Sequence, residues 1–172
     1  MANKYNQHAK TSVGYDEVLS EKCLAEIKRR LLGASRQDVA EQIRKSVQVD
    51  ILCYGVKHAD VHKIGLDIVR KLRAEGLPQT IHIAGLLFQS KKYEESLIGS
   101  QLVGALARLI SASDFDKISP WADLVNSPQT ADSLATSCLS PCLAAKPSLV
   151  KIMREWARSG NAPKRRVSIS SF

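Results

Sequence analysis

The segment DEVLSEKCLAEIKRRLLG, residues 16–33, indicates the fold class of the chain. Its apolar residues recur every three or four positions, and this spacing places them on one face of an α-helix. Gly33 follows the last of them, as glycine often does just beyond a helix. The segment therefore predicts a first helix over residues 16–32 with this apolar face: Val18, Leu19, Cys23, Leu24, Ile27, Leu31 and Leu32.

Similar spacing continues along the chain, and capping residues and prolines mark several helix starts. Pro141 is expected to end one of these helices, because proline breaks a helix interior. No stretch alternates apolar and polar residues as a strand does, so we predict an all-α fold, with the short connections of an α-solenoid. The expected helices cover residues 35–47, 59–75, 78–88 and 93–110, a short piece after Pro120, then Ser127 to Pro141, Pro147 to Gly160, and a last segment from Pro163.

The length and composition predict one domain. A chain of 172 residues can bury a sizeable core without covalent staples. Residues 1–13 are polar and lack periodicity, which predicts a flexible leader before a single domain over residues 14–172. The longest apolar run, near residues 81–88, is too short to cross a bilayer, so we expect a cytoplasmic protein that does not enter membranes.

The four cysteines are not arranged as a disulfide framework or a metal site. None of them forms a Cys-x-x-Cys motif. Cys138 and Cys142 are four residues apart, but Pro141 lies between them and no histidine pair follows at ligand spacing. We therefore predict small core residues at these positions, no metal site and no cofactor.

Basic residues are concentrated near the end of the sequence. The net charge of the chain is +8, and residues 146–172 carry seven Lys or Arg against one Asp or Glu. A basic segment of this density suits a polyanion such as nucleic acid. A solvated basic face is an equally good interpretation of charge alone.

Three further stretches carry a resemblance. YGVKHADVHKIG at residues 54–65 is similar to a Gly-Val-x-x-Pro-x-x-Arg signature, with Ala59 and His62 in the places of Pro and Arg. PWADLVNS at residues 120–127 is similar to Trp-Trp-Asp-x-Val-Asp, and REWARSGNAPKRRVSIS at residues 154–170 to a segment with Trp, Ser and then Trp-x-Arg-Arg. Together, in this order, they resemble the DNA alkylation repair family of bacterial glycosylases.

The resemblance implies a right-handed superhelix of HEAT-like helix pairs whose concave basic surface binds duplex DNA. It also implies removal of cationic N3- and N7-alkylated purines by a glycosylase, without a cofactor and as a monomer, near the bacterial nucleoid. Asn126 stands at the position of the family's catalytic Asp, and Asp123 is a nearby substitute. A carboxylate there would stabilise the oxocarbenium-like sugar. Ala122 and Pro163 stand where the family has aromatic side chains.

The remaining candidate residues have two interpretations each. Trp121 is a candidate substrate-facing residue, but core packing is the favoured interpretation of its side chain. Asn126, Ser127 and Pro128 also fit an ordinary loop and helix cap. A scaffold that binds an acidic protein partner is the alternative function. The predicted DNA-binding residues share a positive charge and flank a helix start that suits phosphate: Lys151, Arg154, Arg158, Lys164, Arg165 and Arg166.

Overall fold

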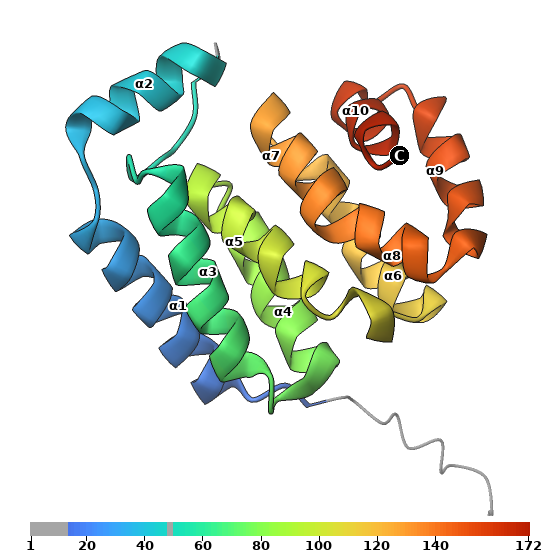
Figure 1. Cartoon of the computed structure of the whole chain (residues 1–172), viewed down its shortest axis with the longest axis horizontal. Helices are drawn as coiled ribbons and strands as arrows, with labels where there is room; N and C mark the ends of the chain where they lie inside the picture. Colours follow the sequence, from blue (N-terminus) through green and yellow to red (C-terminus); the bar gives the residue numbers. More distant parts are fainter. Residues whose placement is uncertain (1–13, 48–49) are drawn as a thin grey trace, which may run out of the picture.

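The computed structural model describes residues 14–47 and 50–172, and the predicted leader over residues 1–13 lies outside them. The described chain is helical, with one isolated bridge between Leu52 and Lys92, which confirms the all-α prediction (Figure 1). The α-helices are α1 Glu17–Gly33, α2 Gln37–Val47, α3 His58–Leu72, α4 Gly76–Gln89, α5 Tyr93–Gly104, α6 Ala112–Ile118, α7 Pro128–Ser133, α8 Ser140–Ala145, α9 Val150–Ala157 and α10 Ala162–Ser170. Shorter helical pieces connect them: η1 Ala107–Leu109, η2 Ser119–Asp123, η3 Leu134–Leu139 and η4 Pro147–Leu149.

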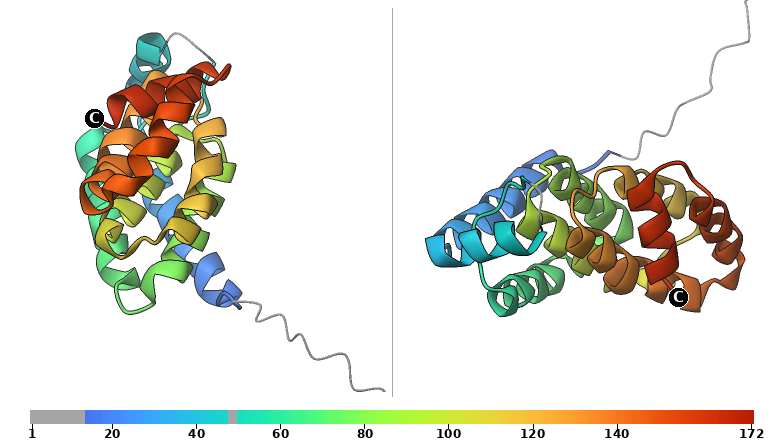
Figure 2. Two further views of the ribbon diagram at one scale, coloured as in Figure 1. Left: turned by 90° about the vertical axis from the view of Figure 1, so that its right-hand side faces the viewer. Right: turned by 90° about the horizontal axis from the view of Figure 1, so that it is seen from above.

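The helices stack in two layers, as in an α-solenoid. In one layer α4 contacts α1 and α6, and in the other α5 contacts α3, α7 and η3 (Figures 1 and 2). The two layers meet chiefly through α4 and α5, and α9 packs on α10 at the end of the array. Most helices thus bury their apolar faces against helices of the same or the adjacent pair, which is how helical arrays build a core.

One cluster of buried apolar side chains runs through the array, from Cys23 in α1 to Val167 in α10. The rings of Phe88 in α4 and Trp121 in η2 stack within it at a centroid distance of 4.9 Å. Such an aromatic pair contributes about 1 kcal/mol beyond the area that it buries. Cys138 and Cys142 are both buried free thiols, as predicted.

Two predicted helix ends were wrong. The helix expected over residues 93–110 ends at Gly104, and the chain then turns through η1. Helical spacing over residues 93–110 would have placed Leu109 on the inward face with Leu102 and Leu106, but Leu109 is 63% exposed as a result. The helix expected to begin at Pro78 starts earlier, at Gly76, whose φ of +78° is accessible to glycine without steric strain.

Pro141 does not end its helix, which corrects a further prediction. In a regular α-helix its ring would clash with the carbonyl of Ser137, four residues earlier. The π-helical turn η3 precedes it instead, and the helix continues through α8 to Ala145. The Ser137 carbonyl lies so close to Gly104 of α5 that a Cβ at residue 104 would collide with it. The proline is therefore accommodated by the wider turn together with a glycine on the facing helix.

Candidate functional site

The segment PWADLVNS at residues 120–127 forms η2 and the start of α7, and its tryptophan belongs to the core. Trp121 is 4% exposed and Ala122 is buried. The stack on Phe88 accounts for the position of the indole. Trp121 is thus a packing residue, as the favoured interpretation had it, and its candidate role as a substrate-facing side chain is wrong. The predicted cap is confirmed, because the Ser127 hydroxyl accepts the amide of Thr130 and Pro128 occupies the first turn of α7.

Asn126, the predicted catalytic residue, holds two parts of the fold together. Its Nδ2 donates to the carbonyl of Lys91, in the turn between α4 and α5, at 2.6 Å. Its Oδ1 lies 3.5 Å from the hydroxyl of Thr130, which donates to it. Lys91 has a φ of +55°, a strained conformation for lysine. Because a carbonyl can only accept, an amide suits this position and a carboxylate would repel its partner.

Asp123, the second predicted catalytic residue, also has both oxygens engaged. Oδ1 accepts from Nδ2 of Asn161 at 2.8 Å, and Oδ2 accepts from Nζ of Lys164 at 3.0 Å. Asn161 in turn caps α10 by accepting the amide of Lys164 at 3.1 Å. Asp123 therefore connects η2 to the start of α10.

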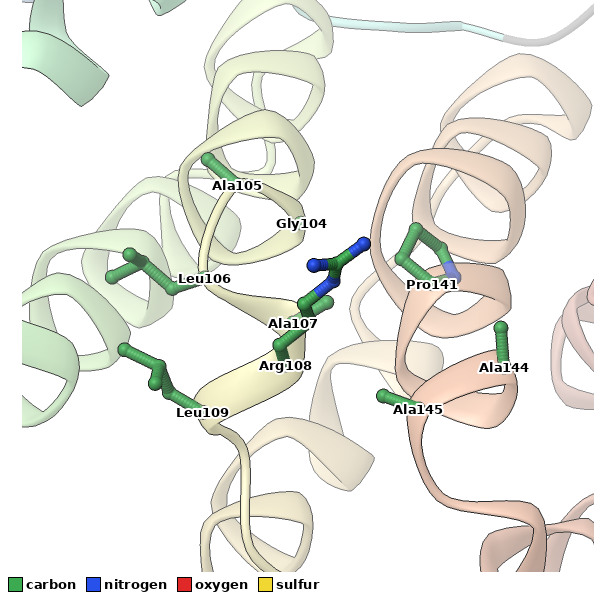
Figure 3. A pocket seen from close by; sticks show the side chains of 9 residues that line it. All are labelled: Gly104, Ala105, Leu106, Ala107, Arg108, Leu109, Pro141, Ala144 and Ala145. Atoms are coloured by element: carbon green, nitrogen blue, oxygen red, sulfur yellow. The ribbon is translucent and has the colours of Figure 1, made fainter.

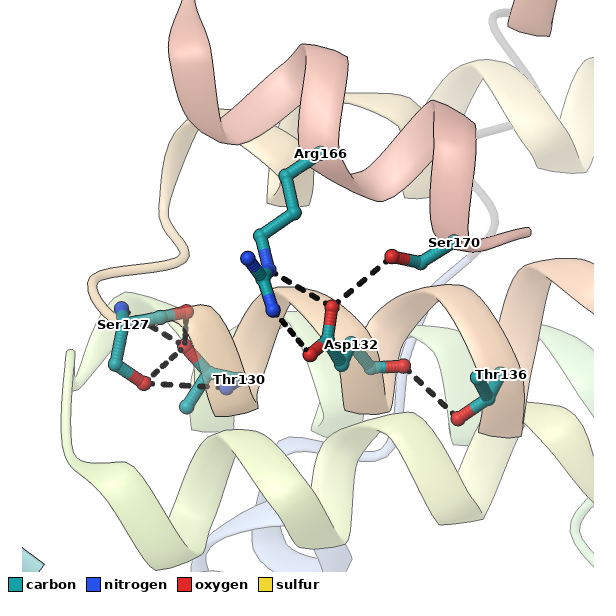
Figure 4. A network of polar contacts seen from close by, with 6 residues as sticks. All are labelled: Ser127, Thr130, Asp132, Thr136, Arg166 and Ser170. Carbon is teal, nitrogen blue, oxygen red and sulfur yellow. Dashed lines mark hydrogen bonds and ion pairs between the residues drawn. The ribbon is translucent and has the colours of Figure 1, made fainter. Parts of the chain in front are cut away.

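Arg166 forms a two-point ion pair with Asp132 of α7. Its Nε and Nη2 donate to the two carboxylate oxygens at 2.8 and 2.6 Å, and Ser170 donates to the same carboxylate at 3.0 Å (Figure 4). The hydrogen bonds from Arg166 hold the pKa of Asp132 below its usual range. This geometry fixes the guanidinium in one orientation and holds α10 against α7.

The predicted DNA-binding residues therefore divide into two sets. Lys164 and Arg166 pair with acids, and Arg165 donates to the carbonyls of Ser159 and Gly160 at the end of α9. The other set has no acidic partner among the described residues. It follows one exposed face of α9, opposite the buried Met153 and Trp156, and comprises Lys151, Arg154 and Arg158.

A pocket of about 410 Å³ brings together residues from the second and third stretches of resemblance. Asn126 lies on one wall and Arg166 on the other, while Trp121 and Asp123 do not line it. The rest of the lining is largely aliphatic. The full lining consists of Val125, Asn126, Ser127, Pro128, Ala131, Ala162, Pro163 and Arg166.

A second cavity of about 480 Å³ lies away from these residues, between the end of α5 with η1 and α8 (Figure 3). Pro141 and the small residues Gly104 and Ala144 line it, and the side chain of Arg108 extends from η1 towards α8. None of the predicted site residues lies here. Gly104, which packs against the Ser137 carbonyl, and Pro141 both line it, so the cavity lies beside that crossing.

Glu94 of α5 binds the first stretch of resemblance, and the sequence analysis did not identify it. It is fully buried, and its carboxylate accepts the backbone amides of Tyr54, Gly55 and Val56 at 2.8 to 3.1 Å. It thereby holds the YGV turn before α3. The sequence feature that could have identified it is the acidic pair Glu94 and Glu95 in YEESLIG. Carboxylates at the start of so apolar a helix are expected to be buried and therefore to need hydrogen-bond partners.

The neighbouring tyrosine joins the same turn to α5. The hydroxyl of Tyr54 donates to Glu95 and accepts from Nζ of Lys92 at 2.9 Å. Burial, and then the bond to Glu95, raise the pKa of Tyr54. His62, in the same stretch, is exposed and lies 3.1 Å from Nε2 of Gln101 through its Nδ1.

These features define an all-α, solenoid-like protein with a polar network and a small pocket near the end of the array. The family described as DNA alkylation repair enzyme matches residues 27–172, and the chain therefore belongs to that family. A role related to DNA repair follows from this membership. Neither the curated proteins nor the solved structures contained a match. Within residues 14–47 and 50–172, no helix has the length and apolar character needed to span a membrane.

Proposed function

We propose that the protein binds duplex DNA in alkylation repair and that it does so without efficient base removal. The observation that carries the proposal is the meeting of two family segments, residues 120–127 and 154–170, at one pocket. The segments are separated in sequence by α7, η3, α8, η4 and the start of α9, yet Asn126 and Arg166 face the same space. The pocket supplies a place for a modified nucleotide beside a basic end of the molecule.

The phosphate contacts are assigned to the unpaired stripe of α9. Lys151, Arg154 and Arg158 are exposed and spaced three and four residues apart, so they present three cations along one line. Lys164 and Arg166 already have carboxylate partners, which a phosphate would have to displace. No ion pair of the described residues involves the α9 stripe, so a phosphate would displace none there, although Glu155 is exposed on the same face.

Base removal is expected to be inefficient because no carboxylate is free at the pocket. Asn126 is neutral, and its amide is committed to Lys91. Both oxygens of Asp123 and both oxygens of Asp132 accept hydrogen bonds. Cleavage of a glycosidic bond needs a negative group close to the sugar as positive charge develops there.

Fluorescence anisotropy with a duplex, over a series of salt concentrations, tests DNA binding. We expect the affinity to fall steeply with salt, and the triple change Lys151→Gln, Arg154→Gln and Arg158→Gln to make the slope of log K against log salt shallower by up to about 2.7. A matched triple change on α1, Lys22→Gln, Lys28→Gln and Arg29→Gln, should leave the slope nearly unchanged. Equal competition by heparin and by duplex would instead favour a scaffold for an acidic protein partner.

Incubation with DNA treated by a methylating agent tests base removal. We expect no release of N3- or N7-methylated purines above the rate with no protein, under conditions in which the duplex is fully bound. Rapid release would show that excision proceeds without a free carboxylate, and that part of the proposal would be wrong.

A further inference from the structure

An apolar groove lies beside η1, away from the predicted site residues. It is the cavity of about 480 Å³ between the end of α5 with η1 and α8, here called the η1 groove. Apart from Arg108, its lining residues are glycine, alanine, leucine and proline. Leu109 is 63% exposed, and Ala105, Ala144 and Ala145 are exposed as well. Contiguous apolar surface that faces water is typical of interaction sites.

The backbone of η1 is fixed by hydrogen bonds and by a buried anchor. α5 ends at Gly104, and the chain then turns through η1, where the amide of Leu109 donates to the carbonyl of Leu106 at 2.9 Å. Ile110 follows and is fully buried, so it holds the turn against the core. An exposed leucine on a turn fixed in this way binds a partner without the loss of freedom that a flexible loop would suffer.

Arg108 is the one charged residue among those that line the groove, and its charge is not compensated. No ion pair or hydrogen bond of the described residues involves its guanidinium. Arg166 differs, because Asp132 accepts from two of its nitrogens at 2.6 and 2.8 Å. A carboxylate that bound Arg108 would displace only water and would form a charge-assisted hydrogen bond.

The two walls of the groove lie on opposite sides of this guanidinium. In Figure 3 the side chains of Leu106 and Leu109 lie on one side of Arg108, and those of Pro141 and Ala144 lie on the other. An occupant that matches both walls and the charge therefore has an acidic side chain between two apolar ones. A helix presents such a row at positions i, i+4 and i+7. The small side chains of α8 leave room for its backbone to approach closely.

We infer that the η1 groove docks an acidic amphipathic helix of a partner protein, with one carboxylate on Arg108 and an apolar side chain on each wall. The net charge of +8 favours an acidic partner, because opposite charges accelerate encounter. Duplex DNA matches the groove poorly, since a single cation among apolar side chains offers few phosphate contacts. The docking is separate from the proposed DNA binding, which is assigned to α9, and either can fail without the other.

A pair of labelled helical peptides of about 20 residues tests the inference. Both are rich in alanine and carry two leucines that lie two helical turns apart. They differ only between the leucines, where one peptide has glutamate and the other has glutamine. Fluorescence anisotropy would measure their binding to the full chain. We expect saturable binding of the glutamate peptide and about tenfold weaker binding of the glutamine peptide, as the loss of one charged hydrogen bond predicts.

Variants of the chain locate the bound peptide. Arg108→Gln should weaken binding of the glutamate peptide about tenfold and leave the glutamine peptide unchanged. Arg29→Gln, which removes the same charge from the exposed side of α1, should affect neither peptide. Leu109→Ser should weaken binding of both peptides, because it removes apolar contact and leaves the charge in place. All three positions are exposed, so these changes should preserve the fold.

The triple change on α9 separates docking in the groove from attraction to the basic stripe. It should leave the preference for the glutamate peptide intact. The inference is overturned by no saturable binding of the glutamate peptide, by equal binding of the two peptides, or by a preference that Arg108→Gln does not reduce. Because DNA binding is measured with a duplex, none of these results would contradict the proposed function.

Discussion

Two carboxylates in different halves of the molecule show how differently the two regions use charge. In the α1–α5 region, Glu94 is fully buried and accepts three backbone amides of the YGV turn. In the α7–α10 region, Asp132 is partly exposed and its main partner is the guanidinium of Arg166. The first carboxylate holds backbone in place in a dry environment, and the second holds a side chain that water and ligands can reach.

The difference teaches where the molecule can rearrange. A buried anion that loses its partners keeps its desolvation penalty, so the contacts of Glu94 are not exchangeable. An exposed ion pair contributes little to stability, and its partners can be replaced by water or phosphate. We therefore infer that the polar contacts of Glu94 are fixed parts of the fold and that the ion pair of Asp132 is exchangeable.

Of the changes considered, Glu94→Gln is expected to lower the free energy of unfolding most. The neutral amide would direct N–H groups at backbone N–H donors, and the loss of two or more charged hydrogen bonds should lower the free energy of unfolding by about 4 kcal/mol. Urea unfolding followed by circular dichroism would measure it. Glu95→Gln, at the next position, should lose less, because Glu95 accepts from one hydroxyl, which an amide oxygen can replace, and its ion pair with Lys92 is long at 3.7 Å. Similar losses for the two variants would contradict the role of Glu94.

Gly104→Ala tests the junction between the two regions. The added Cβ would collide with the Ser137 carbonyl, which the π-helical turn directs towards α5. Because both sides of the contact are backbone, we expect a loss of about 3 kcal/mol. Gly33→Ala is the matched control, since a Cβ there meets nothing within 4 Å and should produce no loss. A melting temperature unchanged in Gly104→Ala would show that the crossing can relax.

Asn126→Asp tests the contact that joins the regions at the site. At neutral pH the introduced carboxylate would face the Lys91 carbonyl, and the lost bond with added repulsion should remove about 2 kcal/mol. When protonated, the same group can donate to that carbonyl, so its folded pKa should lie above the unfolded value of about 3.9. The stability deficit should then be small at pH 3 and grow as the pH rises. Asn126→Ala should show a deficit with no such pH dependence.

Asp132→Asn should have the smallest effect and would sharpen the contrast with Glu94. Arg166 lowers the pKa of Asp132, so the ion pair stabilises the fold above the unfolded pKa and its contribution is lost as the pH falls. Since both partners are well exposed, we expect a loss below about 1 kcal/mol at neutral pH. Stability curves between pH 2 and 6 should converge for the variant and the natural protein at the acid end. A loss comparable to that of Glu94→Gln would remove the distinction between the two carboxylates.

Helix positions and the core were largely predictable from the sequence, because apolar spacing is a local property of the chain. Ile27 of α1 and Ile64 and Ile68 of α3 are buried as their spacing predicts, but Val18 and Leu32, which we also expected on the apolar face of α1, are 60% and 54% exposed because they lie outside the buried face. The prediction that Pro141 ends its helix was wrong, because the clash of its ring is avoided by a wider turn that packs against Gly104 of another helix. The inward position expected for Leu109 was wrong for a similar reason, since α5 ends five residues before it.

The candidate site was predictable only in its location. Asn126 and Arg166 were selected from separate stretches, and they do line one pocket. Asn126 binds Lys91, 35 positions away, and Arg166 binds Asp132, 34 positions away. Pairs so far apart in the sequence cannot be predicted from a local sequence pattern.

The sequence by itself determined the all-α class, the family and the basic character of the last 27 residues, since periodicity, motif order and charge are all written along the chain. Only the tertiary structure decided which of those basic side chains are left without an acidic partner and can bind a ligand. Packing α10 against η2 and α7 gave Lys164 and Arg166 acidic partners, while the outer face of α9 met none among the described residues. Coulomb interactions depend on distances through space, and folding sets those distances.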